Sequence, residues 1–240
     1  MDSFLSKLLY KNYYYKNKRI KLNDIRTLNY NNNLRRFESA NQILLSQTST
    51  KLESYYKLRL LEIEKIVKRY AIKKIIEFGS GRTTIFFNFL KEKNKISVKT
   101  YEQDSKWKKI LVAAGKEINI TRMNICVRPV TKYKEGGKFS NIDKETVDLL
   151  YIDGPYINRY KKFLTFTLKP IYYDFYEFLQ GKFIPKVIMI EGRTDTVDEI
   201  LNSDQVSNYF FKGEFAWSMQ RKNYFQAIAA RRHSIFIRKF

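Results

Sequence analysis

Cysteine is almost absent from this chain, which has 240 residues and a single cysteine, Cys126. One cysteine excludes both a disulfide framework and a zinc site built on cysteines. Long apolar runs are missing too: the segment 187–190 is among the longest, whereas a membrane-spanning helix needs about 20 apolar residues. The first thirty residues have neither the hydrophobic stretch nor the small-residue cleavage site of a signal peptide. These absences predict a cytoplasmic protein.

Acidic residues are scarce relative to basic ones: 24 Asp and Glu stand against 46 Lys and Arg, a net charge of +22. Such a charge attracts nucleic acid, a phospholipid surface, or an acidic or phosphorylated substrate. The alternative is compositional, because abundant Lys, Asn, Ile, Tyr and Phe with nine Gly and four Pro are typical of an AT-rich genome. Hydrophobic residues make up 44%, with 18 Phe and 18 Tyr. We therefore expect one medium-sized domain with a real core.

The N-terminal segment is the most basic part of the chain. Its first 36 residues contain nine Lys and Arg against two Asp, a net charge of +7. Four apolar residues there have helical spacing: Phe4, Leu5, Leu8 and Leu9. They predict either a membrane-surface helix or, as we favour because the stripe is short, a helix docked on the domain. We divide the chain into a basic helical extension, residues 1–50, and one domain, residues 51–240.

Strands and helices are predicted to alternate after a long amphipathic helix that ends near Tyr70. The predicted strands are 74–78, 97–101, 125–127, 147–152, 187–190, 209–211 and 234–237. Helical patterns lie at 85–90 and 107–114, and aromatic helices are expected between Pro170 and Gly181. This order is typical of a doubly wound parallel sheet, which binds ligands at the carboxyl ends of its strands.

The loop after the first predicted strand carries the most chemical information. Gly79 and Gly81 let the backbone turn tightly and approach a ligand at the start of a helix. A dinucleotide site would favour a third glycine where Thr84 stands and an apolar residue where Glu77 stands. A carboxylate at Glu77 suits an ammonium and a sulfonium better than a pyrophosphate, and Glu102 after the second strand can accept both ribose hydroxyls. We therefore expect S-adenosylmethionine (SAM) rather than NAD.

Three segments carry a resemblance to a known family. They read EFGSGRTT at 77–84, YEQDSKW at 101–107 and VDLLYIDGP at 147–155. Together they resemble the motifs of class I SAM-dependent methyltransferases, and in particular small O-methyltransferases that modify glycans. The resemblance covers about residues 72–240. It implies an α/β fold with a Rossmann-like sheet of seven strands, mostly parallel with an antiparallel last strand.

The resemblance also implies a set of cofactor-binding residues. Glu77 would lie near the amino group of SAM, Glu102 would hold the ribose, and Gln103 would neighbour the adenine. The full set is Glu77, Gly79, Ser80, Gly81, Thr83, Thr84, Glu102 and Gln103.

Asp153, which follows the fourth predicted strand, is the main candidate for chemistry at the methyl acceptor. It could remove the proton of an attacking hydroxyl, or bind Mg²⁺ or Mn²⁺ together with Glu191 after the fifth strand. Gly192 and Arg193 stand where a metal site would need further oxygen ligands, so we lean toward the direct role. His233, the only histidine, is a further candidate base. The candidate substrate-binding residues are Tyr156, Arg159 and Arg193.

The predicted function is SAM-dependent O-methylation, with a sugar hydroxyl of a surface glycan or its precursor as the acceptor. The partner would be an anionic or sugar-type substrate, with the basic extension as a candidate contact to a membrane surface. One alternative is RNA methylation, although Ile152-Asp153-Gly154-Pro155 lacks the signature of amino-group methyltransferases. The other is a catalytically silent module on the same fold that binds nucleic acid.

Overall fold

The computed structural model describes residues 54–120, 122–155, 171–179, 184–191, 193–203, 209–215 and 233–238. The predicted N-terminal extension, residues 1–50, lies outside the described residues, as do Tyr156 and Arg159. Four α-helices are described: α4 (Ser54–Arg69), α5 (Arg82–Asn94), α6 (Ser105–Lys116) and α7 (Thr194–Leu201). None of these helices combines the length and apolar composition that a membrane span requires.

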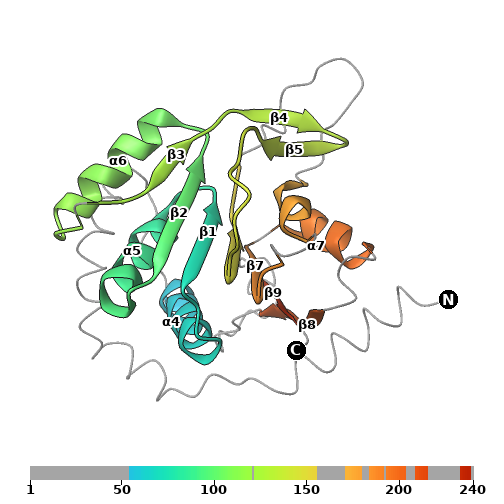
Figure 1. Ribbon diagram of the computed structural model, residues 1–240, viewed down its shortest axis with the longest axis horizontal. Coiled ribbons are helices and arrows are strands. Elements are labelled where there is room, and N and C mark those ends of the chain that lie inside the picture. The colour runs from blue at the N-terminus through green and yellow to red at the C-terminus, as the bar shows by residue number, and fades with distance from the viewer. Residues whose placement is uncertain are drawn as a thin grey trace, which may run out of the picture.

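A seven-stranded sheet forms the centre of the molecule (Figure 1). Its strands are β1 (Lys74–Phe78), β2 (Ser97–Glu102), β3 (Ile125–Val127), β6 (Leu149–Ile152), β7 (Val187–Glu191), β8 (Tyr209–Phe215) and β9 (His233–Arg238). Their order in space is β3-β2-β1-β6-β7-β9-β8. The first five strands in this order pair in parallel, and β9 pairs antiparallel with both β7 and β8. The predicted fold, a mostly parallel sheet with an antiparallel last strand, is confirmed.

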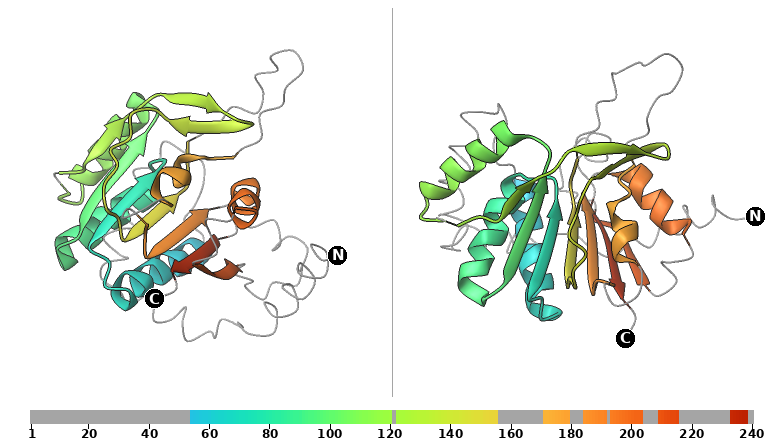
Figure 2. Two further views of the ribbon diagram at one scale, coloured as in Figure 1. Left: turned by 45° about the vertical axis from the view of Figure 1, so that its right-hand side comes forward. Right: turned by 45° about the horizontal axis from the view of Figure 1, so that its top comes forward.

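Helices cover both faces of this sheet, as the right-hand view of Figure 2 shows with α5 and α6 on one side and α7 on the other. On the first face, buried side chains of α4, α5 and α6 form one hydrophobic cluster with alternate residues of the strands. On the second face, α7 and the short 3₁₀ helix η1 (Asp174–Phe178) form a second cluster. Because successive strand residues point to opposite faces, each central strand contributes to both clusters. This two-sided burial explains why these strands are continuous apolar runs.

The connection from β3 to β6 contains a β-hairpin that the sequence analysis missed. Its strands, β4 (Val130–Tyr133) and β5 (Gly136–Phe139), pair antiparallel and lie apart from the main sheet. Asp174 of η1 joins the hairpin to the second face, because its fully buried carboxylate accepts the Phe139 N–H at 2.8 Å. Burial raises the pKa of Asp174 to about 8. Of the aromatic helices predicted between Pro170 and Gly181, the described residues contain only the single 3₁₀ segment η1.

Candidate cofactor and catalytic site

The loop between β1 and α5 is held against the loop after β6 by two glycines. Gly79 has a positive φ of 82° and donates its N–H to the Tyr101 carbonyl at 2.9 Å. A Cβ placed on Gly79 would lie 2.4 Å from the Gly154 Cα, and a Cβ on Gly154 would lie 2.4 Å from the Gly79 Cα. Only glycine satisfies both the backbone conformation and this contact. The ends of β1 and β6 are thereby brought together at one edge of the sheet.

Gly81 differs from this pair, because the structure around it has room for a side chain. A Cβ on Gly81 would meet no atom within 4 Å, so open space lies beside it. Gly81 is also the N-cap of α5, and its N–H bonds the Thr84 hydroxyl oxygen at 2.8 Å. The backbone at the start of α5 is therefore fixed while one side of Gly81 stays open, which fits close approach by a ligand.

Glu77 is buried in the protein interior, beneath this loop. Its side chain is fully buried, and its oxygens accept hydrogen bonds from three hydroxyls: Thr83 at 2.6 Å, Thr84 at 2.7 Å and Thr100 at 2.8 Å. Burial raises the pKa of Glu77 to about 7 although the three hydroxyls act in the opposite direction. In this arrangement Glu77 links β1, β2 and α5. Direct contact of Glu77 with a ligand ammonium remains a prediction.

Glu102 lies at the end of the adjacent strand β2 and is 6% exposed. One oxygen accepts the N–H groups of Gln103 at 2.7 Å and Asp104 at 2.9 Å. The other accepts the Ser80 N–H at 2.8 Å and is also in contact with the Ser80 hydroxyl. Because the Ser80 hydroxyl rotates freely, a ribose hydroxyl could take its place on Glu102 without moving the backbone.

Asp104 and Trp107, which also belong to the second segment, have structural roles. Asp104 is the N-cap of α6 and accepts the N–H groups of Lys106 and Trp107. The Trp107 indole N–H donates to the Ser80 carbonyl at 2.9 Å. The first helix turn after β2 therefore supports the loop after β1.

Asp153 and Arg193 lie together where β6 and β7 end. The Arg193 guanidinium donates to the Asp153 carbonyl, and its Nη2 is 3.6 Å from the Asp153 carboxylate. The same guanidinium lies over the Tyr172 ring, 4.9 Å from the ring centroid. Both side chains are half-buried. A catalytic candidate and a substrate-binding candidate thus lie side by side, and their roles remain predictions.

Glu191 is at the same edge but has a buried partner. It is 2% exposed, and it accepts the Tyr151 hydroxyl at 2.9 Å. His233 begins β9, and its backbone is in register with Glu191. The His233 side chain lies outside the described residues.

The described donor groups do not fit a divalent metal site. No three His, Cys, Asp or Glu side chains among the described residues are grouped closely enough to hold an ion. The Arg193 cation stands beside Asp153, and Glu191 is bonded to Tyr151. A positive guanidinium at that distance opposes a second cation. The metal role of Asp153 and Glu191 remains a prediction.

Sequence reasoning missed the threonine and tyrosine partners of the acidic residues. Thr100 is the registered neighbour of Glu77 on β2, and its one signal was a small polar residue within the predicted strand 97–101. Tyr151 gave no such signal, because the mostly apolar segment 147–152 predicts that a tyrosine there is an ordinary core residue.

Comparison with known proteins identifies the fold. No protein-family model matches the chain, and no curated protein matches its sequence. The structure is similar to an O-methyltransferase from Bacillus cereus in complex with SAH: 14% identity, 85% of this chain and 90% of that chain covered, and a TM-score of 0.50. It is also similar to a proposed O-methyltransferase from Klebsiella pneumoniae: 11% identity, 87% and 90% covered, and a TM-score of 0.51. The chain therefore has the fold of a class I SAM-dependent methyltransferase.

Proposed function

We propose that the chain is a SAM-dependent methyltransferase whose acceptor is a hydroxyl group. The observation that carries the proposal is the pairing of an open-sided Gly81 with Glu102 at the ends of adjacent strands. Gly81 leaves room for a ligand against the start of α5, and Glu102 offers a carboxylate that a ribose diol can reach once Ser80 rotates. When bound, SAM would supply an electrophilic methyl group on a positively charged sulfur.

The acceptor would approach between the ends of β6 and β7. There Asp153 is the candidate base: its carboxylate takes the hydroxyl proton while the acceptor oxygen forms its bond to the methyl carbon and the sulfur–carbon bond breaks. Arg193, 3.6 Å from that carboxylate, would orient it and attract an anionic group of the acceptor. A sugar hydroxyl on an acidic glycan or its precursor suits this pair and the net charge of +22.

Calorimetry of ligand binding tests the cofactor assignment. We expect the protein to bind SAM or its demethylated product and not NAD. Glu102→Ala should weaken binding by about 1.5–3 kcal/mol, the scale for a lost hydrogen bond to a charged group. Glu92→Ala, which removes an exposed carboxylate from α5, is the matched control and should bind normally.

Gly81→Ala provides a second, steric test. Its methyl group meets no protein atom, so the variant should fold and yet bind SAM poorly because the methyl occupies ligand space. Tighter binding of NAD than of SAM, or normal SAM binding by both Glu102→Ala and Gly81→Ala, would overturn the assignment.

A further inference from the structure

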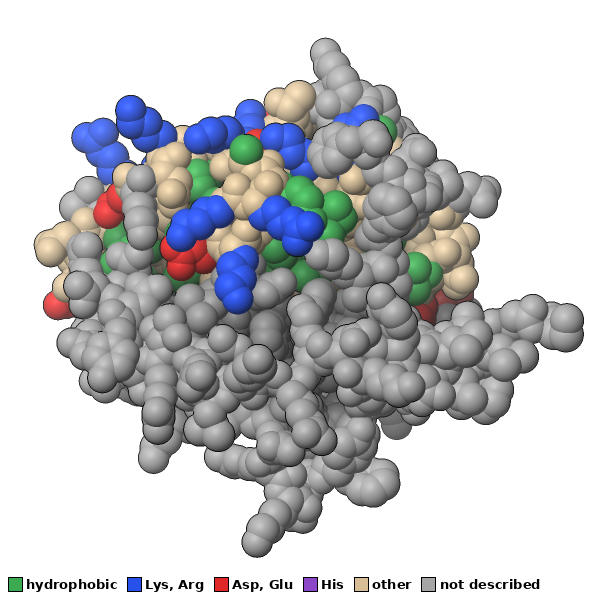
Figure 3. Space-filling view, turned by 90° about the horizontal axis from the view of Figure 1, so that it is seen from below, with side chains coloured by type: hydrophobic (Ala, Val, Ile, Leu, Met, Phe, Trp, Pro, Cys, Tyr) green, Lys and Arg blue, Asp and Glu red, His purple; other side chains and the backbone are tan. Residues whose placement is uncertain are grey.

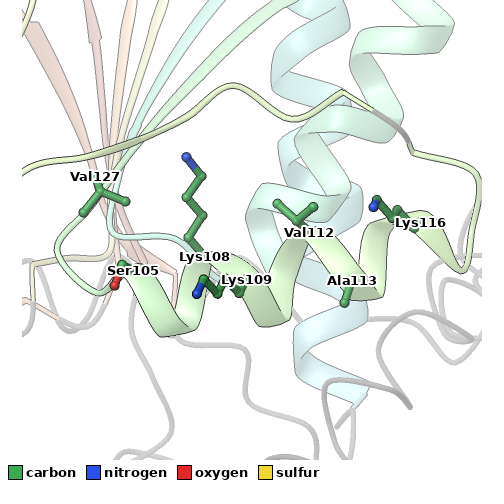
Figure 4. Close-up of a pocket in the computed structure, with 7 residues that line it drawn as sticks. All are labelled: Ser105, Lys108, Lys109, Val112, Ala113, Lys116 and Val127. Carbon is green, nitrogen blue, oxygen red and sulfur yellow. The ribbon is translucent and has the colours of Figure 1, made fainter.

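One side of α6 forms a groove with the edge of the sheet, and its lining is basic. The groove has a volume of about 500 Å³ and lies between α6 and Val127 at the end of β3. Figure 4 shows Lys108, Lys109 and Lys116 on α6 with Val112 and Ala113 between them along the helix. These positions are spaced three or four residues apart and so share one helix face. We call this surface the α6 groove.

The lysines of the α6 groove have no acidic partners among the described residues, whereas Lys74 and Lys186 elsewhere form ion pairs. At the opposite end of the strands, Lys74 is 2.5 Å from Glu145, and Lys186 is 3.0 Å from Asp148. Figure 3, viewed from below, shows acidic side chains beside basic ones on that part of the surface. Helix α6 itself contains no acidic residue, and the nearby Asp104 carboxylate is used by the helix cap. The positive charge of the groove is therefore not neutralised locally.

The placement of these charges is unfavourable for the helix itself. Lys106, Lys108 and Lys109 lie within its first five residues, where the helix dipole is positive; no residue of the first turn is acidic, and the Asp104 carboxylate just before it caps the helix. A cation at that end costs about 0.3–1 kcal/mol at low ionic strength. The helix dipole thus gives no reason for Lys108 and Lys109, although it favours Lys116 in the last turn, whereas an anionic ligand would be attracted by all three lysines.

We propose that the α6 groove binds the phosphate backbone of a nucleic-acid strand. Lysines 108 and 116 are separated by eight residues, about 12 Å along a helix, so they can contact different phosphates of one strand. The groove offers three lysine ammonium groups, which bind phosphates as point charges. Its lining contains no aromatic ring on which a base could stack. Binding should therefore be independent of sequence.

The groove also adjoins the candidate cofactor segment along the chain. It begins at Ser105, directly after the segment 102–104 that holds Ser80 and caps α6. This inference goes beyond the proposed function, because strand binding requires neither SAM nor turnover.

Fluorescence anisotropy with a labelled single-stranded RNA of about a dozen nucleotides tests the proposal, since such strands match typical site sizes. Lys108→Ala, Lys109→Ala and Lys116→Ala combined should weaken binding by at least about tenfold and lower the salt slope by about 2. The matched control combines Lys65→Ala, Lys68→Ala and Arg69→Ala, three exposed residues of α4, and should change binding far less. The three Lys→Arg replacements in the groove should retain binding.

Several results would overturn the proposal. Equal losses in the groove and control variants would mean that only net charge matters. Better competition by an acidic polysaccharide than by unlabelled RNA, or preferential binding to anionic lipid vesicles, would assign the groove to another partner. SAM binding, measured on the same variants, should be unchanged, so failure of this proposal is distinguishable from failure of the proposed function.

Discussion

Gly79 and Gly154 contact each other through their backbones, and neither position has room for a side chain. The Cβ of an alanine at either position would lie 2.4 Å from the Cα of the other glycine. Gly79 differs in also having a positive φ of 82°. The pair therefore separates two costs of replacing glycine: steric overlap alone at Gly154, and overlap with backbone strain at Gly79.

We expect Gly154→Ala to lower the free energy of unfolding by about 1–3 kcal/mol, the usual cost of overpacking. Gly79→Ala should cost more, because alanine is also disfavoured at its positive φ. Urea denaturation measures both, with Gly81→Ala as the control because a Cβ there meets no atom. Equal stability of the Gly154→Ala and Gly81→Ala variants would contradict the contact.

The hydroxyl of Thr100 should matter more at high pH than at low pH. Its hydrogen bond to Glu77 at 2.8 Å favours the charged carboxylate, while burial raises the pKa of Glu77 to about 7. Because this pKa lies above the ordinary 4.5, the stability that Glu77 contributes falls as the pH rises from about 4.5 to 7. Thr100→Val raises the pKa further and should cost about 1–2 kcal/mol at pH 8, and less at pH 5.

Urea unfolding at the two pH values checks this prediction. Thr146→Val, at an exposed threonine, serves as the control and should show little change at either pH. A cost for Thr100→Val that does not vary with pH would mean that Glu77 does not titrate in this range.

Asp153→Asn should preserve the fold and SAM binding while reducing turnover by about 10²-fold or more, the usual contribution of a positioned base. Release of the demethylated product with sugar acceptors gives the rate. We expect activity to be indifferent to EDTA and to fall at low pH as the carboxylate protonates. Loss of activity with EDTA and its recovery with Mg²⁺ or Mn²⁺ would show instead that Asp153 and Glu191 bind a metal. Turnover of Asp153→Asn near that of the unmodified protein would favour His233 as the base.

The main sheet could be predicted from sequence because its strands are short apolar runs between polar or glycine-containing loops. The segments 74–78 and 125–127 were predicted with the bounds that β1 and β3 have. The hairpin was missed because β4, with the sequence VTKY, is mostly exposed, and β5 begins with two glycines. Neither strand shows the alternation that marks a half-buried strand. Their position depends on tertiary contacts such as the one from Asp174 to Phe139.

The residues of the candidate site could be predicted from the sequence, whereas their hydrogen bonds and ion pairs could not. Parallel strands end at one edge, so Glu102 and Asp153 could be assigned to that edge from their places after predicted strands. The bonds of Glu77 could not be assigned in this way, because they depend on the register of β1 against β2, which pairs Glu77 with Thr100. Likewise, the contact of Arg193 with Asp153 depends on how closely β6 and β7 end together.

Trp107 provides an intrinsic fluorescence signal next to the candidate cofactor loop. The chain has two tryptophans, Trp107 and Trp217, and the Trp107 indole donates directly to the Ser80 carbonyl. Indole emission depends on the hydrogen bonds and polarity around the ring, so a ligand bound against the loop of Ser80 should change it. A Trp217→Phe protein would therefore report loop occupancy by intrinsic fluorescence alone, without a label and before any acceptor is known.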